Sequence, residues 1–186
     1  LANAVAYIEN ALERGLHIDQ FAQNLTFFLA GGMDFFEEIA KFRSARKLWA
    51  NILSDRFGAK KPASLKLPIF CYTAGSNLTA QQPLNNISRV TIAALAAVLG
   101  GVQTLATSSY DEALATPSTD AATVALRTQQ IIAYESGAIN TVDPLAGSYF
   151  IEKLTTELEK EVLHYIERID GWGGAIRSIE NRKFQS

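Results

Sequence analysis

The chain has 186 residues, of which 48% are hydrophobic and 19% charged, and its formal net charge is -2. This is globular material that can bury a sizeable core, and it lacks the clustered basic face that nucleic acid would require. The single cysteine, Cys71, excludes an internal disulfide framework and favours a reducing compartment, either the cytoplasm or an organelle matrix. Of these two we expect the cytoplasm. Its apolar stretches fall short of the roughly 20 residues of a membrane helix, and we expect no membrane partner.

The first part of the chain predicts a helix, a strand and a second helix. Residues 2–16 have apolar residues on one helical face and glutamates opposite, and we expect further chain upstream of Leu1. The apolar block 25–30 has the length of a buried strand and is closed by two glycines. From Asp34, a helix cap, helical spacing continues to near Gly58.

The second part repeats this alternation twice. The block 67–73 predicts a strand, and the alanine-rich segment 79–99 predicts a helix that ends at a glycine pair. Residues 102–107 predict the third strand. Residues 111–136 predict a helix, either continuous or broken near Pro117. A last amphipathic helix carries apolar residues from Phe150 to Ile169 and ends at the glycines of residues 171–174, before a short basic tail.

Strands that alternate with helices over short connections predict an α/β fold of parallel strands joined by right-handed crossovers. Only about three strands can be counted, whereas a β/α barrel needs eight. The residues alone therefore leave two alternatives open, a piece of a barrel or a small open sheet.

Motifs for acid–base or metal chemistry are sparse. The glycine pairs lack the further glycine or lysine of a phosphate loop, and His17, His164 and Cys71 are too scattered for a zinc site or a cysteine nucleophile. We interpret His17 as a capping or packing residue and His164 as a surface residue. The carboxylate pair Asp111 and Glu112 is interpreted as helix N-terminal acids that complement the helix dipole.

Several ordered motifs closely resemble those of the methylmalonyl-CoA mutase family, the adenosylcobalamin-dependent acyl-CoA mutases. They cover nearly the whole chain and comprise residues 19–22, 73–86, 94–103, 111–114, 126–130 and 143–149. The resemblance implies that the fold is the later part of a (β/α)8 TIM-type barrel with a C-terminal helical extension. Residues 1–149 would supply about three β/α units, and residues 150–186 would form helices leading out of the barrel.

The resemblance also identifies positions where the family's site would lie. The resemblance implies that four of these positions carry replacements in this chain. Asn24 stands where the family has an arginine that contacts the CoA phosphates. Phe70 and Tyr72 stand where the family has a histidine and a glutamine that face the cofactor, and Ala106 stands where it has another histidine. The resemblance implies retained cofactor-binding positions at Gln103 and Glu112 and retained substrate-binding positions at Thr26 and Thr104, with Arg127 also kept. It supplies no catalytic residue and no metal ligand here.

Loss of polar site residues within a preserved framework predicts a non-catalytic small (β) subunit of methylmalonyl-CoA mutase. It would bind no adenosylcobalamin itself and would support, as a heterodimer with a homologous large catalytic subunit, the isomerisation of (R)-methylmalonyl-CoA and succinyl-CoA. One alternative is an active acyl-CoA mutase of altered specificity, which would bind an acyl-CoA itself. The others are a stand-alone acyl-CoA-binding or cobalamin-delivery module and an unrelated α/β domain.

Overall fold

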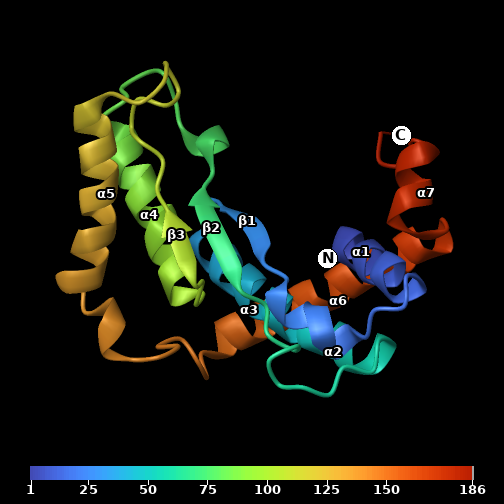
Figure 1. Cartoon of the computed structure of the whole chain (residues 1–186). Coiled ribbons are helices and arrows are strands. Elements are labelled where there is room, and N and C mark those ends of the chain that lie inside the picture. Colours follow the sequence, from blue (N-terminus) through green and yellow to red (C-terminus); the bar gives the residue numbers. More distant parts are fainter. Residues whose placement is uncertain (186) are drawn as a thin grey trace. The chain divides into compact units, whose positions relative to one another are not determined.

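The computed structural model describes residues 1–185, and the chain forms two compact units. Unit 1 comprises residues 1–25, 44–67 and those from 156 onward, and unit 2 comprises residues 26–43 and 68–155. Figure 1 shows the elements of both units along the chain. Over residues 1–185, no helix is both long and apolar enough to cross a membrane.

Unit 2 is built on a parallel sheet of three strands in the order β1-β2-β3 (Figure 1). The strands are β1 (Phe27–Gly31), β2 (Ile69–Thr73) and β3 (Thr104–Ala106). Each crossover between them carries a helix, as parallel pairing requires. The sheet therefore confirms the predicted α/β class and the parallel strand direction.

Alternating side chains give the sheet two different faces. Ile69, Cys71 and Thr73 of β2 are buried, and α4 (Asn85–Leu99) contacts all three strands. Four buried alanines on α4 let the helix approach the sheet closely. The opposite face, here called the aromatic face, consists by register of two rows across the strands. These rows are Phe28, Phe70 and Thr104, and Ala30, Tyr72 and Ala106.

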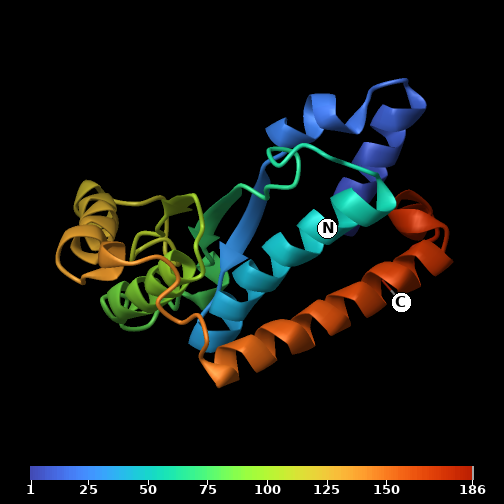
Figure 2. The ribbon, with the colours of Figure 1, turned by 90° about the horizontal axis from the view of Figure 1, so that it is seen from below.

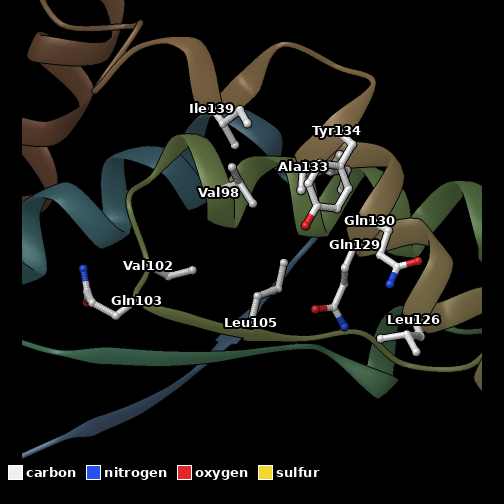
Figure 3. A pocket seen from close by; sticks show the side chains of 11 residues that line it. Val98, Val102, Gln103, Leu105, Leu126, Gln129, Gln130, Ala133, Tyr134 and Ile139 are labelled. Atoms are coloured by element: carbon white, nitrogen blue, oxygen red, sulfur yellow. The ribbon is translucent and has the colours of Figure 1, made fainter.

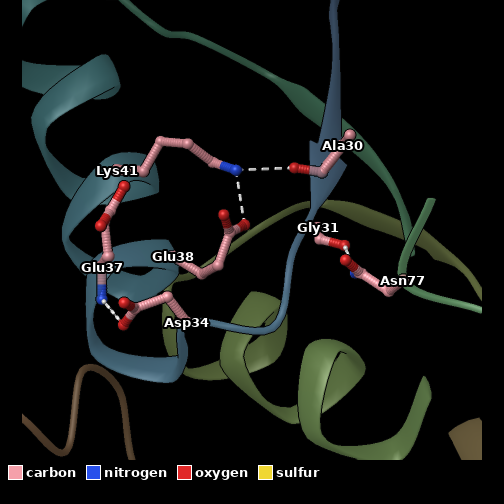
Figure 4. A network of polar contacts seen from close by, with 7 residues as sticks. All are labelled: Ala30, Gly31, Asp34, Glu37, Glu38, Lys41 and Asn77. Carbon is pink, nitrogen blue, oxygen red and sulfur yellow. Dashed lines mark hydrogen bonds and ion pairs between the residues drawn. The ribbon is translucent and has the colours of Figure 1, made fainter. Parts of the chain in front are cut away.

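A network of polar contacts orders the turn between β1 and α3 (Phe35–Asn51) (Figure 4). Lys41 Nζ donates to the Ala30 carbonyl at 2.7 Å and to Glu38 at 2.5 Å. The Asp34 carboxylate accepts from the Glu37 N–H at 3.4 Å, as predicted for a residue at the start of this helix.

Four further helical segments complete unit 2. Helix α5 (Thr119–Tyr134) contacts α4 and is capped by the Ser118 hydroxyl, which accepts from the Ala121 N–H. The 3-10 turns η3 (Gly75–Asn77) and η4 (Ala138–Asn140) follow β2 and α5. The start of α6 (Tyr149–Gly171) places Ile151 against Ile39 and Ala96, and these three buried residues form a core cluster.

Unit 1 is helical. It contains α1 (Ala2–Glu13), α2 (Ile18–Phe21), the 3-10 turn η1 (Ala22–Asn24), the π-helical turn η2 (Ile52–Arg56) and α7 (Gly174–Glu180), together with the later parts of α3 and α6. Its core cluster joins Val5, Ile52 and Ile166. In this unit α3 and α6 lie side by side (Figure 2), and Lys47 pairs with Glu159 at 2.7 Å.

The predicted elements differ most from the structure in three places. Residues 79–84 are not helical, because Pro83 disrupts the first turn and Gln82 has a φ of 52°. Residues 111–118 are not helical, so α5 begins only at Thr119. The predicted basic tail contains α7, which starts after Gly173 at a φ of 93°. The glycine pair after α4 does cap the helix as predicted, since Gly101 has a φ of 79°.

Candidate functional site

Polar groups gather at the carboxyl ends of β2 and β3. The Tyr72 phenol donates to the Glu112 carboxylate, with its oxygen 3.0 Å from Oε2 and 3.1 Å from Oε1. Glu112 Oε1 also accepts from the Ser109 N–H at 2.6 Å. The loop after β3 thus folds back to β2, and both carboxylate oxygens of Glu112 have partners from this chain.

A second, buried set of hydrogen bonds lies beside this pair. The Ser108 N–H donates to Thr73 Oγ1 at 2.8 Å, and the Ser108 hydroxyl donates to the Thr73 carbonyl at 2.6 Å. Thr107 Oγ1 donates to the Ala125 carbonyl at 2.7 Å and accepts from Gln129 at 2.9 Å. The loop after β3 is therefore fixed to both β2 and α5.

Asn86 fixes the loop that precedes α4. Its side chain is fully buried, and its Nδ2 donates to the carbonyls of Thr79 and Tyr110 at 2.9 Å and 2.8 Å. Its Oδ1 accepts from the Thr79 N–H at 3.1 Å and from Arg89 at 2.8 Å. This asparagine orders both loops at this end of the sheet.

The aromatic face is apolar except at Tyr72 and Thr104. The rings of Phe28 and Phe70 lie with centroids 5.1 Å apart, and Phe28 is 66% exposed. Partial burial is the largest cause that raises the pKa of the Tyr72 phenol, and the hydrogen bond to Glu112 raises it further. The phenol is therefore neutral at physiological pH and serves Glu112 as a hydrogen-bond donor.

The interpretation of Asp111 and Glu112 as helix N-terminal acids is wrong, because no helix begins there. Asp111 Oδ2 accepts from the Ser118 N–H at 2.9 Å, and the hydrogen bond from this backbone group is the largest cause that lowers the pKa of Asp111. Glu112 instead bonds to Tyr72 across the sheet edge. The two carboxylates therefore have separate structural roles.

The structure separates the other predicted site residues from Glu112. Gln103 precedes β3 at the amino end, where its Oε1 accepts from the Ile69 N–H at 2.8 Å and its Nε2 donates to the Gly101 carbonyl at 2.9 Å. Thr26 and Thr104 are exposed at the amino ends of β1 and β3. Their substrate-binding role and the cofactor-binding role of Gln103 stay predictions.

The remaining predicted positions have simple surroundings. Asn24 is exposed in η1, and Ala106 pairs with Tyr72 in the sheet register. Arg127 is exposed, and its guanidinium donates a hydrogen bond to the Gln130 side chain one turn further along the helix. The Tyr72–Glu112 and Thr73–Ser108 bonds were not predicted, although the parallel register, once known, brings the ends of β2 and β3 together.

The histidines and the cysteine take no part in this site. His17 Nδ1 accepts from the Asp19 N–H at 3.3 Å and caps α2, as predicted. His164 is exposed on α6, which confirms its assignment to the surface. Cys71 is a buried free thiol. Within residues 1–185, no group of three or more His, Cys, Asp or Glu side chains is placed to hold a metal ion.

A cavity of about 380 Å³ lies beside β3 and is distinct from the Tyr72–Glu112 pair. Figure 3 shows side chains from α4, β3 and α5 around it. Its lining is mostly apolar, with Val98, Val102, Leu105, Leu126 and Ile139, and three glutamines supply polar groups. No acid or base lines it except the Tyr134 phenol.

Comparison with known proteins identifies the class of this fold and site. The family model described as methylmalonyl-CoA mutase matches residues 1–186. The chain therefore belongs to the methylmalonyl-CoA mutase family, an isomerase family, as the resemblance predicted.

Individual relatives agree with this assignment. The chain is 49% identical over 185 residues to the 2-hydroxyisobutanoyl-CoA mutase large subunit of Aquincola tertiaricarbonis, covering 100% of this chain and 33% of that protein. It is 49% identical over 180 residues to methylmalonyl-CoA mutase of Escherichia coli K12, covering 97% of this chain and 25% of the relative. The mitochondrial methylmalonyl-CoA mutase of Bos taurus is 44% identical over 179 residues, covering 96% and 24%. The chain thus spans a third or less of the length of these relatives.

Proposed function

We propose that this chain is a segment of a mutase subunit that performs no chemistry itself and works beside a homologous catalytic subunit. The small (β) subunit of methylmalonyl-CoA mutase is the form we favour. The observation that carries the proposal is the set of side chains on the aromatic face. It presents Phe70, Tyr72 and Ala106, and its nearest carboxylate, Glu112, is already bonded within the chain.

The proposed architecture is the later part of a (β/α)8 barrel. Three parallel strands in sequential order, each followed by a helix, support it. On this proposal residues 1–149 belong to the barrel and residues 150–186 lead out of it. The aromatic face would then point toward the barrel axis, where the family holds its ligands.

The side chains on this face do not fit adenosylcobalamin, the cofactor that the family resemblance implies. A corrin carries many amide groups, which need hydrogen-bond partners when water is excluded. Phe28, Phe70 and Ala106 supply none, and the Glu112 oxygens are bonded to Tyr72 and Ser109. We therefore assign no chemical step to this chain. Gln103 and Glu112 are the positions at which cofactor contact would first be sought.

Substrate contacts are reduced in the same way. Asn24 replaces the family's arginine and offers neither a fixed positive charge nor the planar fork that binds phosphate in two places. Thr26 and Thr104 keep hydroxyl groups, which could bind an acyl-CoA only through single neutral hydrogen bonds. We therefore propose that the acyl-CoA of the (R)-methylmalonyl-CoA and succinyl-CoA isomerisation binds to the partner, and that the heterodimer is cytoplasmic.

Titration of the full-length protein with adenosylcobalamin, followed by absorbance, tests the proposal. We expect no binding by this subunit alone, and binding and turnover of methylmalonyl-CoA after mixing with the homologous large subunit, with which it should co-purify. Cofactor binding and acyl-CoA turnover by the subunit alone would overturn the proposal.

A second candidate is an active mutase with altered acyl-CoA specificity. It is supported by the 49% identity to a mutase large subunit and by the ordered Tyr72–Glu112 pair, which keeps polar groups at the carboxyl end of the sheet. The same titration separates the two candidates, because an active mutase binds the cofactor without a partner. A panel of branched acyl-CoA substrates would then identify its specificity.

A further inference from the structure

We infer that Tyr72 is the residue that prevents a corrinoid from binding to the aromatic face. Its phenol is hydrogen-bonded to the Glu112 carboxylate, and its ring lies in the row between Ala30 and Ala106. The inference rests on the proposed function and names the residue responsible for the lost binding. It treats Tyr72 as a determinant of ligand specificity rather than as one of four equivalent replacements.

The first observation is that the Glu112 carboxylate is already hydrogen-bonded within the chain. Its two oxygens lie 3.1 Å and 3.0 Å from the Tyr72 hydroxyl, and Oε1 also lies 2.6 Å from the Ser109 nitrogen. Charge-assisted hydrogen bonds of this kind are stronger than neutral ones. A hydroxyl or amide of a ligand that donates to this carboxylate would compete with the Tyr72 phenol for its oxygens.

The second observation is the position of Tyr72 in the sheet register. Tyr72 pairs with Ala30 on one side and with Ala106 on the other, and all three belong to the same row of the aromatic face. Neither alanine extends beyond Cβ, so Tyr72 is the only long side chain in this row. Since the row lies at the carboxyl end of the sheet, its bulk stands where ligands of β/α barrels bind.

The neighbouring row differs in kind. Phe28 and Phe70 contact each other at a centroid distance of 5.1 Å and make no hydrogen bond through their side chains. Shortening either ring removes apolar bulk but leaves the Glu112 carboxylate bonded to Tyr72. This difference provides a matched control on the same face of the same sheet.

The test compares four forms of the full-length protein, namely the unmodified subunit, Tyr72→Gln, Tyr72→Phe and the control Phe28→Leu. Binding of hydroxocobalamin and adenosylcobalamin is measured by absorbance titration without the partner subunit, after circular dichroism has shown native folding. We expect Tyr72→Gln, which removes both ring and phenol, to bind corrinoid at least tenfold more tightly than the unmodified subunit. Tyr72→Phe, which releases Glu112 but keeps the ring, should show a smaller gain, and Phe28→Leu none.

A readout independent of any ligand accompanies the titration. The carboxylate stretching bands in the infrared difference spectrum should shift in Tyr72→Phe, because Glu112 loses a donor, and should not shift in Phe28→Leu. If Tyr72→Gln does not fold, Tyr72→Phe alone decides, since its affinity must exceed that of the unmodified subunit.

The outcomes separate this inference from the proposed function. If the unmodified subunit binds no corrinoid and both Tyr72 variants bind none either, the inference fails while the proposed non-catalytic role stands. If the unmodified subunit already binds the cofactor and turns over an acyl-CoA, the proposed function fails. Equal gains in Phe28→Leu and Tyr72→Gln would also overturn the inference, because bulk alone would then explain the closure.

Discussion

Thr73 and Ser108 are joined by two buried hydrogen bonds. The Ser108 N–H donates to Thr73 Oγ1 at 2.8 Å, and the Ser108 hydroxyl donates to the Thr73 carbonyl at 2.6 Å. Both residues are buried. The end of β2 and the loop after β3 are therefore joined through a serine and a threonine that carry no charge.

Ser108→Ala should destabilise the protein by about 1–3 kcal/mol, because it leaves the Thr73 carbonyl without its hydroxyl donor in a buried position. Urea unfolding of the full-length protein measures the change. Thr141→Val, at an exposed loop position, is the control and should change stability by less than about 0.5 kcal/mol. Equal stabilities of the two variants would contradict the structural role of Ser108.

Gly100→Ala should destabilise the protein by about 1–3 kcal/mol through overpacking. A Cβ at Gly100 would lie 2.8 Å from Phe42 Cδ2 and 3.1 Å from the Ala96 carbonyl oxygen. Thermal unfolding should show a lower midpoint than for Gly75→Ala, where a Cβ meets no atom within 4 Å. The addition of Phe42→Leu should recover part of the loss, and a purely additive double variant would show that this clash is not the cause.

Arg43 anchors the loop before α6, and its loss should cost about 1 kcal/mol. Its guanidinium pairs with Asp143 and, at 2.6 Å, with Glu152, which also accepts from the Gly147 N–H at 3.0 Å. Both carboxylates are partly exposed, so Arg43→Met should destabilise the protein less at high salt than at low salt. The exposed Arg127→Met is the matched control, with no expected loss. A salt-independent effect at Arg43 would point to lost packing instead.

The Cys71 thiol should be unreactive in the native state. Burial raises its pKa from 9.0 to about 11, and the nearby Lys41 charge opposes this only in part. Because the folded-state pKa is raised, the stability that the neutral thiol contributes is present below pH 9 and is lost as the pH rises through about 11. Labelling with a chromogenic disulfide reagent at pH 8 should be slow in buffer and fast in urea. Rapid native labelling would show that β2 opens readily.

The order of elements in unit 2 was predictable because hydrophobic spacing differs between strands and helices. The apolar block 25–30 and the segment 67–73 each correspond to a strand of the sheet, and Gly101 and Gly137 end helices with positive φ. The start of α4 was predicted six residues too early, because the helix indicated by alanines and aliphatic spacing was extended through Pro83. The separate α7 was not predicted, because the three glycines within residues 171–174 favour the end of helical structure.

Less of the candidate site was predictable. The family resemblance located Tyr72, Ala106 and Glu112, but the helix expected from residue 111 placed the carboxylate at a helix terminus. The bond between Tyr72 and Glu112 depends on the path of the loop after β3. Loop paths depend on long-range hydrogen bonds such as those of Thr73 and Ser108, which no local pattern encodes.

The parallel sheet also determines the order in which unit 2 can assemble. Each ladder joins strands separated along the chain by a whole helix, as Phe27 with Ile69 and Phe70 with Thr104 show. Closing such distant pairs costs chain entropy before any contact repays it, whereas α4 and α5 form from local contacts. Strand pairing should therefore be the slow step, during which the apolar segments of β1 and β2 are exposed. Aggregation during refolding should accordingly start from these two strands.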